Sequence, residues 1–144
     1  MQEIISHISG HWLGYFEYGA EYGNLYGEKV TFSLLLEHTG EGQFQGKGIE
    51  HEGVGMNPEP STIKGYVDGQ NINFIKEYQT YYEFDEAGNE VKYTRKPAPL
   101  LTYFGEFNSS DISFEGHWEL ETPTNPVSDH VYIWTGTWKI TKVK

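Results

Sequence analysis

A lysine and a glutamate stand at positions where extended strands would point them into an apolar interior. Alternate residues of a strand share a face, so Lys76 lies on one face with Phe74 and Tyr78, and Glu50 lies on one face with Phe44. A buried ammonium must be paired or lose its proton, because removing its charge from water is costly. The spacing therefore predicts a buried ion pair between Glu50 and Lys76.

Two hypotheses explain such a pair. In the first it is a polar anchor at the floor of a cavity, where it orients a ligand with help from the Tyr78 hydroxyl. In the second it is a structural ion pair, or Lys76 extends toward the mouth of a barrel and keeps its charge in water. The sequence leaves both open.

Aromatic residues would supply the walls of the interior. Most of them need no explanation beyond core packing, but tyrosine and tryptophan near a mouth can also stack on a planar or amphipathic ligand. The candidate ligand-binding residues are Trp12, Glu50, Lys76, Tyr78, Tyr103 and Trp118.

Several kinds of chemistry lack the residues that they need. The chain has no cysteine, which excludes disulfides and thiolate chemistry. His7 and His11 are four residues apart, but a zinc site needs three or four converging ligands, and no such motif occurs. Phosphate-loop, dinucleotide and nucleophile-elbow motifs are also missing. We expect no metal, no cofactor and no catalytic residue that the sequence alone can name.

The positioning elements are strands. Apolar alternation recurs every ten to fifteen residues between turns rich in Gly, Asn, Asp or Pro. Short turns join antiparallel neighbours, so the strands form a meander. The predicted strands lie near residues 11–18, 29–38, 42–51, 61–67, 71–79, 90–95, 100–107, 112–120 and 131–142.

Glycines recur in phase with large apolar residues in six of these strands, as at Gly136 between Trp134 and Trp138. Glycine weakens a strand unless the strand bends sharply or a large side chain lies over it, and a narrow barrel needs both. We predict an all-β fold, a closed antiparallel up-and-down barrel of eight or nine strands. A short N-terminal helical turn with Ile4, Ile5 and Ile8 on one face would plug one end. A two-sheet sandwich is the alternative architecture.

A length of 144 residues suits a single domain, and we expect one domain over residues 1–144. The aromatic content of 16% is too high for a disordered chain. The net charge of −11 would repel phosphates, so neither nucleic acid nor an anionic membrane is expected as a partner. The longest apolar run, at residues 34–36, is far too short for a membrane span, and no secretory signal is visible. We expect a cytoplasmic protein.

The triplet Gly10-His11-Trp12 resembles the Gly-X-Trp opening of lipocalins and avidins, which form the calycin superfamily. The chain is also similar to small bacterial lipocalin-like proteins with a Phe-X-Gly-X-Gly-X-(Asp/Glu) strand, here residues 44–50, and a Phe-X-Lys-X-Tyr strand, here residues 74–78. The resemblance implies an antiparallel barrel with an end cavity for a small ligand and no particular chemistry. The polar residues of the avidin biotin site have no match here, so biotin is not carried over.

Three functions follow as hypotheses. The first is a barrel that binds a small apolar or aromatic ligand at one end. The second is an interaction module with a filled barrel, whose tyrosine-rich loops or outer face bind a protein or a second copy of this chain. The third is a small enzyme that uses Glu50, Lys76, Tyr78 or a histidine as an acid or base.

Overall fold

The computed structural model describes residues 2–54, 56–79, 81–84, 90–93, 100–123 and 131–143. Two helical segments and ten strands occupy these ranges. In chain order they are α1 (Gln2–Ile8), β1 (Gly10–Tyr18), the 3-10 helix η1 (Ala20–Leu25), β2 (Lys29–Gly40), β3 (Gln43–Glu52), β4 (Ser61–Asp68), β5 (Asn71–Tyr78), β6 (Tyr81–Phe84), β7 (Glu90–Tyr93), β8 (Leu100–Asn108), β9 (Ser113–Pro123) and β10 (Val131–Lys142).

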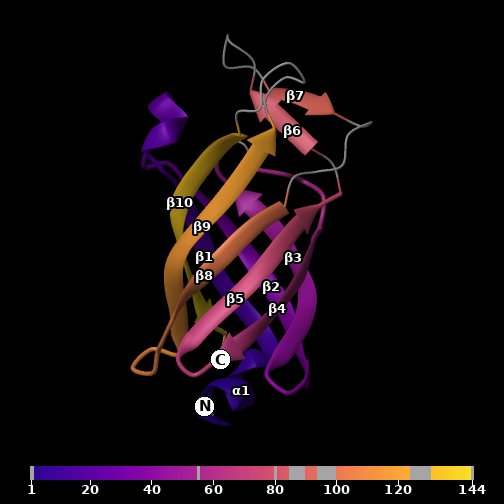
Figure 1. Cartoon of the computed structure of the whole chain (residues 1–144), viewed down its shortest axis with the longest axis vertical. Helices are drawn as coiled ribbons and strands as arrows, with labels where there is room; N and C mark the ends of the chain where they lie inside the picture. Colours follow the sequence, from indigo (N-terminus) through magenta and orange to yellow (C-terminus); the bar gives the residue numbers. More distant parts are fainter. Residues whose placement is uncertain are drawn as a thin grey trace.

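Eight of the strands form a closed antiparallel barrel in the order β1-β10-β9-β8-β5-β4-β3-β2 (Figure 1). The first and last strands close it, since Trp12 lies opposite Lys142 in β10 and opposite Leu34 in β2. Helix α1 lies at one end of the barrel, which we call the α1 end, and η1 lies at the other, the η1 end. The predicted closed meander is confirmed, and the sandwich is excluded.

The strand predicted near 90–95 is not part of the barrel wall. Residues 90–93 form β7, which pairs with β6 in a separate two-stranded sheet beyond one end of the barrel (Figure 1). In the chain these two strands follow β5 and precede β8. Residues 86–89, where the sequence has the Gly and Asn typical of the predicted turns, lie outside the described residues. Neither β6 nor η1 was predicted, because both are short and lack a clear apolar period.

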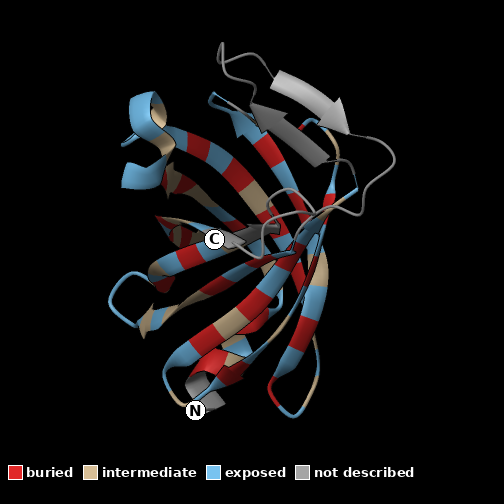
Figure 2. Ribbon diagram, turned by 45° about the horizontal axis from the view of Figure 1, so that its top comes forward, coloured by how far each residue is buried: buried red, intermediate tan, exposed pale blue. Residues whose placement is uncertain are grey.

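Burial alternates along the barrel strands, as the banding of Figure 2 shows. In β2, for example, Val30, Phe32 and Leu34 are buried while Thr31 and Leu35 are exposed. The inward residues of all eight strands form one aromatic-rich core. This period-two pattern is what a barrel with a packed interior requires.

Two indole rings cross neighbouring strands where glycine leaves room. Trp118 in β9 lies opposite Gly136 in β10, and its indole N–H donates to the Glu17 carbonyl of β1 at 3.2 Å. Trp138 in β10 lies opposite Gly116 in β9, and its indole N–H donates to the Phe104 carbonyl of β8 at 3.2 Å. Each ring therefore spans a whole strand and links the strands on either side of it.

Helix α1 closes its end of the barrel with apolar side chains. Ile4 and Ile8 are fully buried, and the indole N–H of Trp12 donates to the Ile8 carbonyl at 2.9 Å. The Lys142 ammonium donates to the carbonyls of His7 and Ser9 and lies 5.2 Å from the centroid of the Trp12 ring. The helical plug predicted from Ile4, Ile5 and Ile8 is confirmed, with Ile5 only half-buried against the core. Within the described ranges, no helix has the length and apolar character needed to cross a membrane.

Replacing Gly136 by alanine should strongly destabilise the barrel. A Cβ atom there would lie 2.0 Å from the Glu17 carbonyl oxygen and 2.4 Å from the Trp118 indole nitrogen, so the backbone or the ring must move. We expect Gly136→Ala to lower the free energy of unfolding by about 3 kcal/mol in urea titration. The matched control is Gly69→Asn, at a turn with φ of 62° and open space beside it, which should be near neutral. Equal stability of the two variants would contradict the close-packing argument.

Candidate ligand-binding site

The buried ion pair predicted from the sequence is present. The Lys76 ammonium lies 3.0 Å from the Glu50 Oε2 atom, and the two side chains are 2% and 3% exposed. Strands β3 and β5 supply the two residues, and β4 separates them. The carboxylate has two further partners: the Tyr78 hydroxyl donates to Oε2, and the Asn57 backbone N–H donates to Oε1 at 2.8 Å. Glu50 is therefore held on both oxygens.

Aromatic rings surround the ammonium. The Lys76 nitrogen lies 4.8 Å from the centroid of the Phe32 ring, 4.9 Å from Phe16, 5.0 Å from Tyr78 and 5.6 Å from Tyr103. Burial among these rings lowers the pKa of Lys76, and the Glu50 charge and hydrogen bond oppose that shift. The electrostatic attraction of the ring faces also favours the charged form of the amine.

Two tyrosines beside the pair stay protonated over a wide pH range. Burial, followed by the negative charge of Glu50, raises the pKa of Tyr78 and of Tyr103 well above the ordinary value. Both hydroxyls are therefore hydrogen-bond donors at any physiological pH.

The cluster lies in the half of the barrel toward the η1 end, because Glu50 and Tyr78 lie near the C-terminal ends of β3 and β5. Tyr22 of η1 packs above it, with ring centroids 4.7 Å from Tyr18 and 5.8 Å from Trp118. The Tyr18 hydroxyl donates to the Val54 carbonyl at 2.7 Å. The 3-10 helix and the segment after β3 thus cover the polar cluster.

The structure brings together five of the six residues that the sequence analysis selected: Glu50, Lys76, Tyr78, Tyr103 and Trp118. Trp118 joins them through Phe16, whose ring centroid lies 5.9 Å away. Trp12 is not among them, since it packs against Phe114 at 5.4 Å at the α1 end. Periodicity assigns Trp12 to the inner face but does not say how far along the barrel it lies.

Sequence reasoning did not select Tyr18, Tyr22 or Asn57 for the site. Tyr18 was detectable, because it follows Phe16 in phase on the inner face of β1. Tyr22 and Asn57 lie in irregular segments, where no period shows which way a residue faces.

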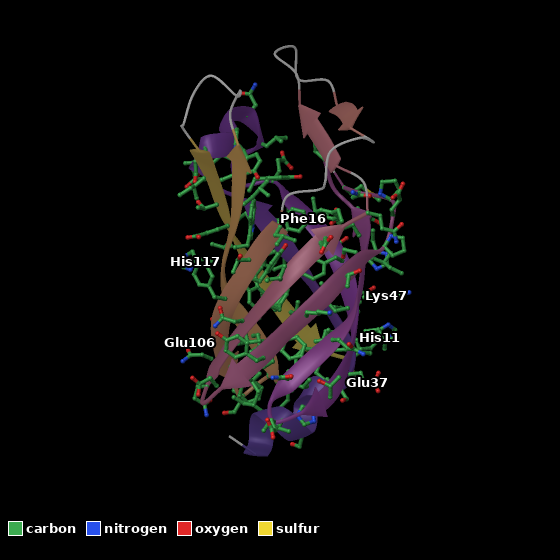
Figure 3. The ribbon with its side chains drawn as sticks, turned by 45° about the vertical axis from the view of Figure 1, so that its right-hand side comes forward. His11, Phe16, Glu37, Lys47, Glu106 and His117 are labelled. Carbon is green, nitrogen blue, oxygen red and sulfur yellow. The ribbon has the colours of Figure 1, made fainter. Side chains whose placement is uncertain are left out.

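The outer face of the barrel has grooves and polar side chains. Two surface grooves of about 750 Å³ and 390 Å³ lie over β5, β8 and β9 and over β2, β3 and β4. In Figure 3, Phe16 points into the barrel, and the other labelled side chains lie on its outside: His11, Glu37, Lys47, Glu106 and His117. In the part of the chain that the structure describes, there is no group of three or more His, Asp or Glu side chains placed to bind a metal ion.

This architecture, a closed eight-stranded antiparallel meander, is a calycin-like barrel. It is similar to the crystal structure of a rhizavidin–biotin complex, with a TM-score of 0.52 and 15% sequence identity over 94% of this chain and 99% of that chain. At this identity the similarity concerns the fold alone. No protein-family model and no curated protein sequence matches the chain.

Breaking the buried pair from one side should be far more costly than removing both charges. Glu50→Gln or Lys76→Met alone leaves an uncompensated buried charge, and each should cost about 3 to 5 kcal/mol. The double variant should regain most of that loss. A double-mutant cycle of urea unfolding measures both effects.

The control for this cycle is the exposed ion pair of Lys139 and Asp111, separated by 3.2 Å, with side chains 33% and 42% exposed. Lys139→Met should leave the free energy of unfolding nearly unchanged, because water screens the pair. An unchanged thermal melt of either Glu50→Gln or Lys76→Met would show that the inner pair does not carry the predicted energy.

Tyr103 should make the protein less stable at alkaline pH. Its folded pKa is raised, so above about pH 10 the unfolded chain loses a proton that the folded chain keeps, and stability falls by about 1.4 kcal/mol per pH unit. Tyr103→Phe removes this contribution, so its stability should fall less steeply above that pH. The lowered pKa of Lys76 has the opposite effect: it makes stability rise with pH up to the ordinary pKa of lysine. This contribution is the same in the wild type and in Tyr103→Phe.

Urea titrations at a series of alkaline pH values measure the two slopes. Tyr66→Phe is the control, because Tyr66 is 51% exposed on the outer face. Parallel slopes for the wild type and Tyr103→Phe would contradict the assignment.

Proposed function

We propose that the barrel binds a small apolar or aromatic molecule at the η1 end. The ligand would lie above a polar floor made by Glu50, Lys76, Tyr78 and Tyr103, with Trp118 at its side. The observation that carries this proposal is the ion pair buried among aromatic rings in the half of the barrel that α1 does not plug.

A buried ion pair is a weak source of stability, because desolvation of both charges offsets their attraction. Hydrophobic residues of similar volume would pack the same space at equal or lower cost. A few polar groups set in an apolar, aromatic lining are, in contrast, the usual composition of a small-molecule site. This contrast favours ligand binding over a purely structural role for the pair.

The fold adds support of a general kind. The similar structure, of a rhizavidin–biotin complex, holds a small molecule. Barrels of eight strands are the size whose interior admits one small ligand or is filled by side chains. The ligand of that complex is not carried over, since shared fold does not imply shared function.

Ligand binding should depend on Trp118 and not on Trp12. Nile red, a neutral aromatic dye, should bind the purified protein with one-to-one stoichiometry in a fluorescence titration. Trp118→Phe should raise its Kd about tenfold, equivalent to about 1.4 kcal/mol. Trp12→Phe, at the α1 end, is the matched control and should leave the Kd unchanged. Equal Kd values for the wild type and both variants would contradict a site at the η1 end.

Self-association is the second candidate function. Leu13 and Ile49 flank Ser33 in one row across β1, β2 and β3, and the two side chains are 52% and 48% exposed. Leu35, 59% exposed, stands next along β2. An apolar patch of this kind on an outer barrel face suits contact with a second copy.

Native mass spectrometry of freshly purified protein distinguishes the two functions. A retained small molecule supports ligand binding, and a bare chain at dimer or tetramer mass supports self-association.

A further inference from the structure

Two buried polar groups among the described residues have hydrogen-bonding capacity left over: the Tyr103 hydroxyl, which has no hydrogen-bond partner, and the Lys76 ammonium, which is paired with Glu50. Lys76 is 1% exposed and Tyr103 is fully buried. The ammonium does have Glu50 as an ion-pair partner at 3.0 Å, but its three N–H groups leave donor capacity over. Tyr103 has a free donor of its own.

The Lys76 and Tyr103 side chains lie beside each other in the interior. Lys76 and Tyr103 project inward from neighbouring strands, β5 and β8, at diagonal positions of the register. The Tyr103 ring stacks on Phe74 with centroids 4.7 Å apart and lies 5.6 Å from the Lys76 nitrogen. The Glu50 carboxylate, next to Lys76, also raises the pKa of Tyr103, so the phenol stays a donor.

An unsatisfied buried hydroxyl is destabilising, because it has lost its hydrogen bonds to water and gained nothing in return. Phenylalanine would fill the same space without that cost. Buried polar groups that reduce stability in this way are characteristic of functional sites.

Charge limits what these donors can receive. Lys76 and Glu50 carry opposite charges and neutralise each other, and Tyr78 donates to the same carboxylate. A carboxylate ligand would add a third charge with no free counter-charge beside it, and burying an unpaired charge costs several kcal/mol. A neutral acceptor oxygen adds no charge.

We propose that the ligand is an uncharged molecule whose carbonyl oxygen accepts hydrogen bonds from Tyr103 and Lys76 while its apolar body lies against the aromatic walls. This inference rests on the proposed function and specifies the ligand class. Tyr103 is then the residue that distinguishes a carbonyl ligand from a hydrocarbon of the same shape.

Three probes of equal shape test the inference: 2-acetylnaphthalene, 2-isopropenylnaphthalene and 2-naphthoate. The first is a neutral ketone, the second replaces its oxygen by a methylene group, and the third is an anion. Quenching of tryptophan fluorescence measures each Kd. We expect the ketone to bind about tenfold more tightly than the alkene, and the anion to bind more weakly than the ketone.

Tyr103→Phe should reduce the ratio of the alkene Kd to the ketone Kd, because only the Lys76 donor then remains for the carbonyl, and its melting temperature should equal or exceed that of the wild type. Tyr66→Phe, on the outer face, should keep the wild-type ratio.

Equal binding of ketone and alkene by the wild type, or preferred binding of the anion, would overturn this inference and leave the proposed function standing. A marked fall in the melting temperature of Tyr103→Phe would show that the hydroxyl has an internal partner and would also overturn it. Binding of none of the three probes would overturn the proposed function, and the inference with it.

Discussion

The indole rings of Trp118 and Trp138 lie across neighbouring strands, and each packs tightly against a glycine, Gly136 of β10 for Trp118 and Gly105 of β8 for Trp138. The rest of the barrel depends on this close approach. Each ring fills the space that glycine leaves and bonds to a carbonyl beyond it, so three strands are linked by one side chain. The narrow cylinder of strands is thereby lined with aromatic rings, among which a buried polar group without a partner is costly.

The interior is divided along its length. Toward α1 it is apolar, sealed by isoleucines and by Trp12, whose indole bonds to the helix. Toward η1 it holds Glu50, Lys76 and several tyrosines among aromatic rings. The polar groups are concentrated in the half toward η1, so that half offers charges and hydrogen-bond donors to a ligand. The half toward α1 offers apolar contacts. The asymmetry supports a single binding end.

Most of the fold follows from local patterns. Period-two alternation and the phase of glycine predicted the closure of the sheet and all eight barrel strands among the described residues, but also gave residues 90–95 as a strand of the same meander, which is wrong. The same phase placed Glu50 and Lys76 inward, and the cost of an unpaired buried charge then required their pairing. Alternation cannot say how far along the axis a residue stands, which is why Trp12 was grouped with residues at the opposite end. Tyr22 in the short helix η1 and Val54 after β3 lie over the polar cluster, and neither segment has a periodic apolar pattern from which this position could be predicted.

The start of the chain and the end of its last strand meet at the α1 end (Figure 1). There the Lys142 ammonium donates hydrogen bonds to the carbonyls of His7 and Ser9. A linker, affinity tag or carrier protein joined at either terminus would therefore project away from the polar half of the barrel. On a sensor surface or a fused scaffold, the molecule would stand with η1 toward the solution and its candidate site unobstructed.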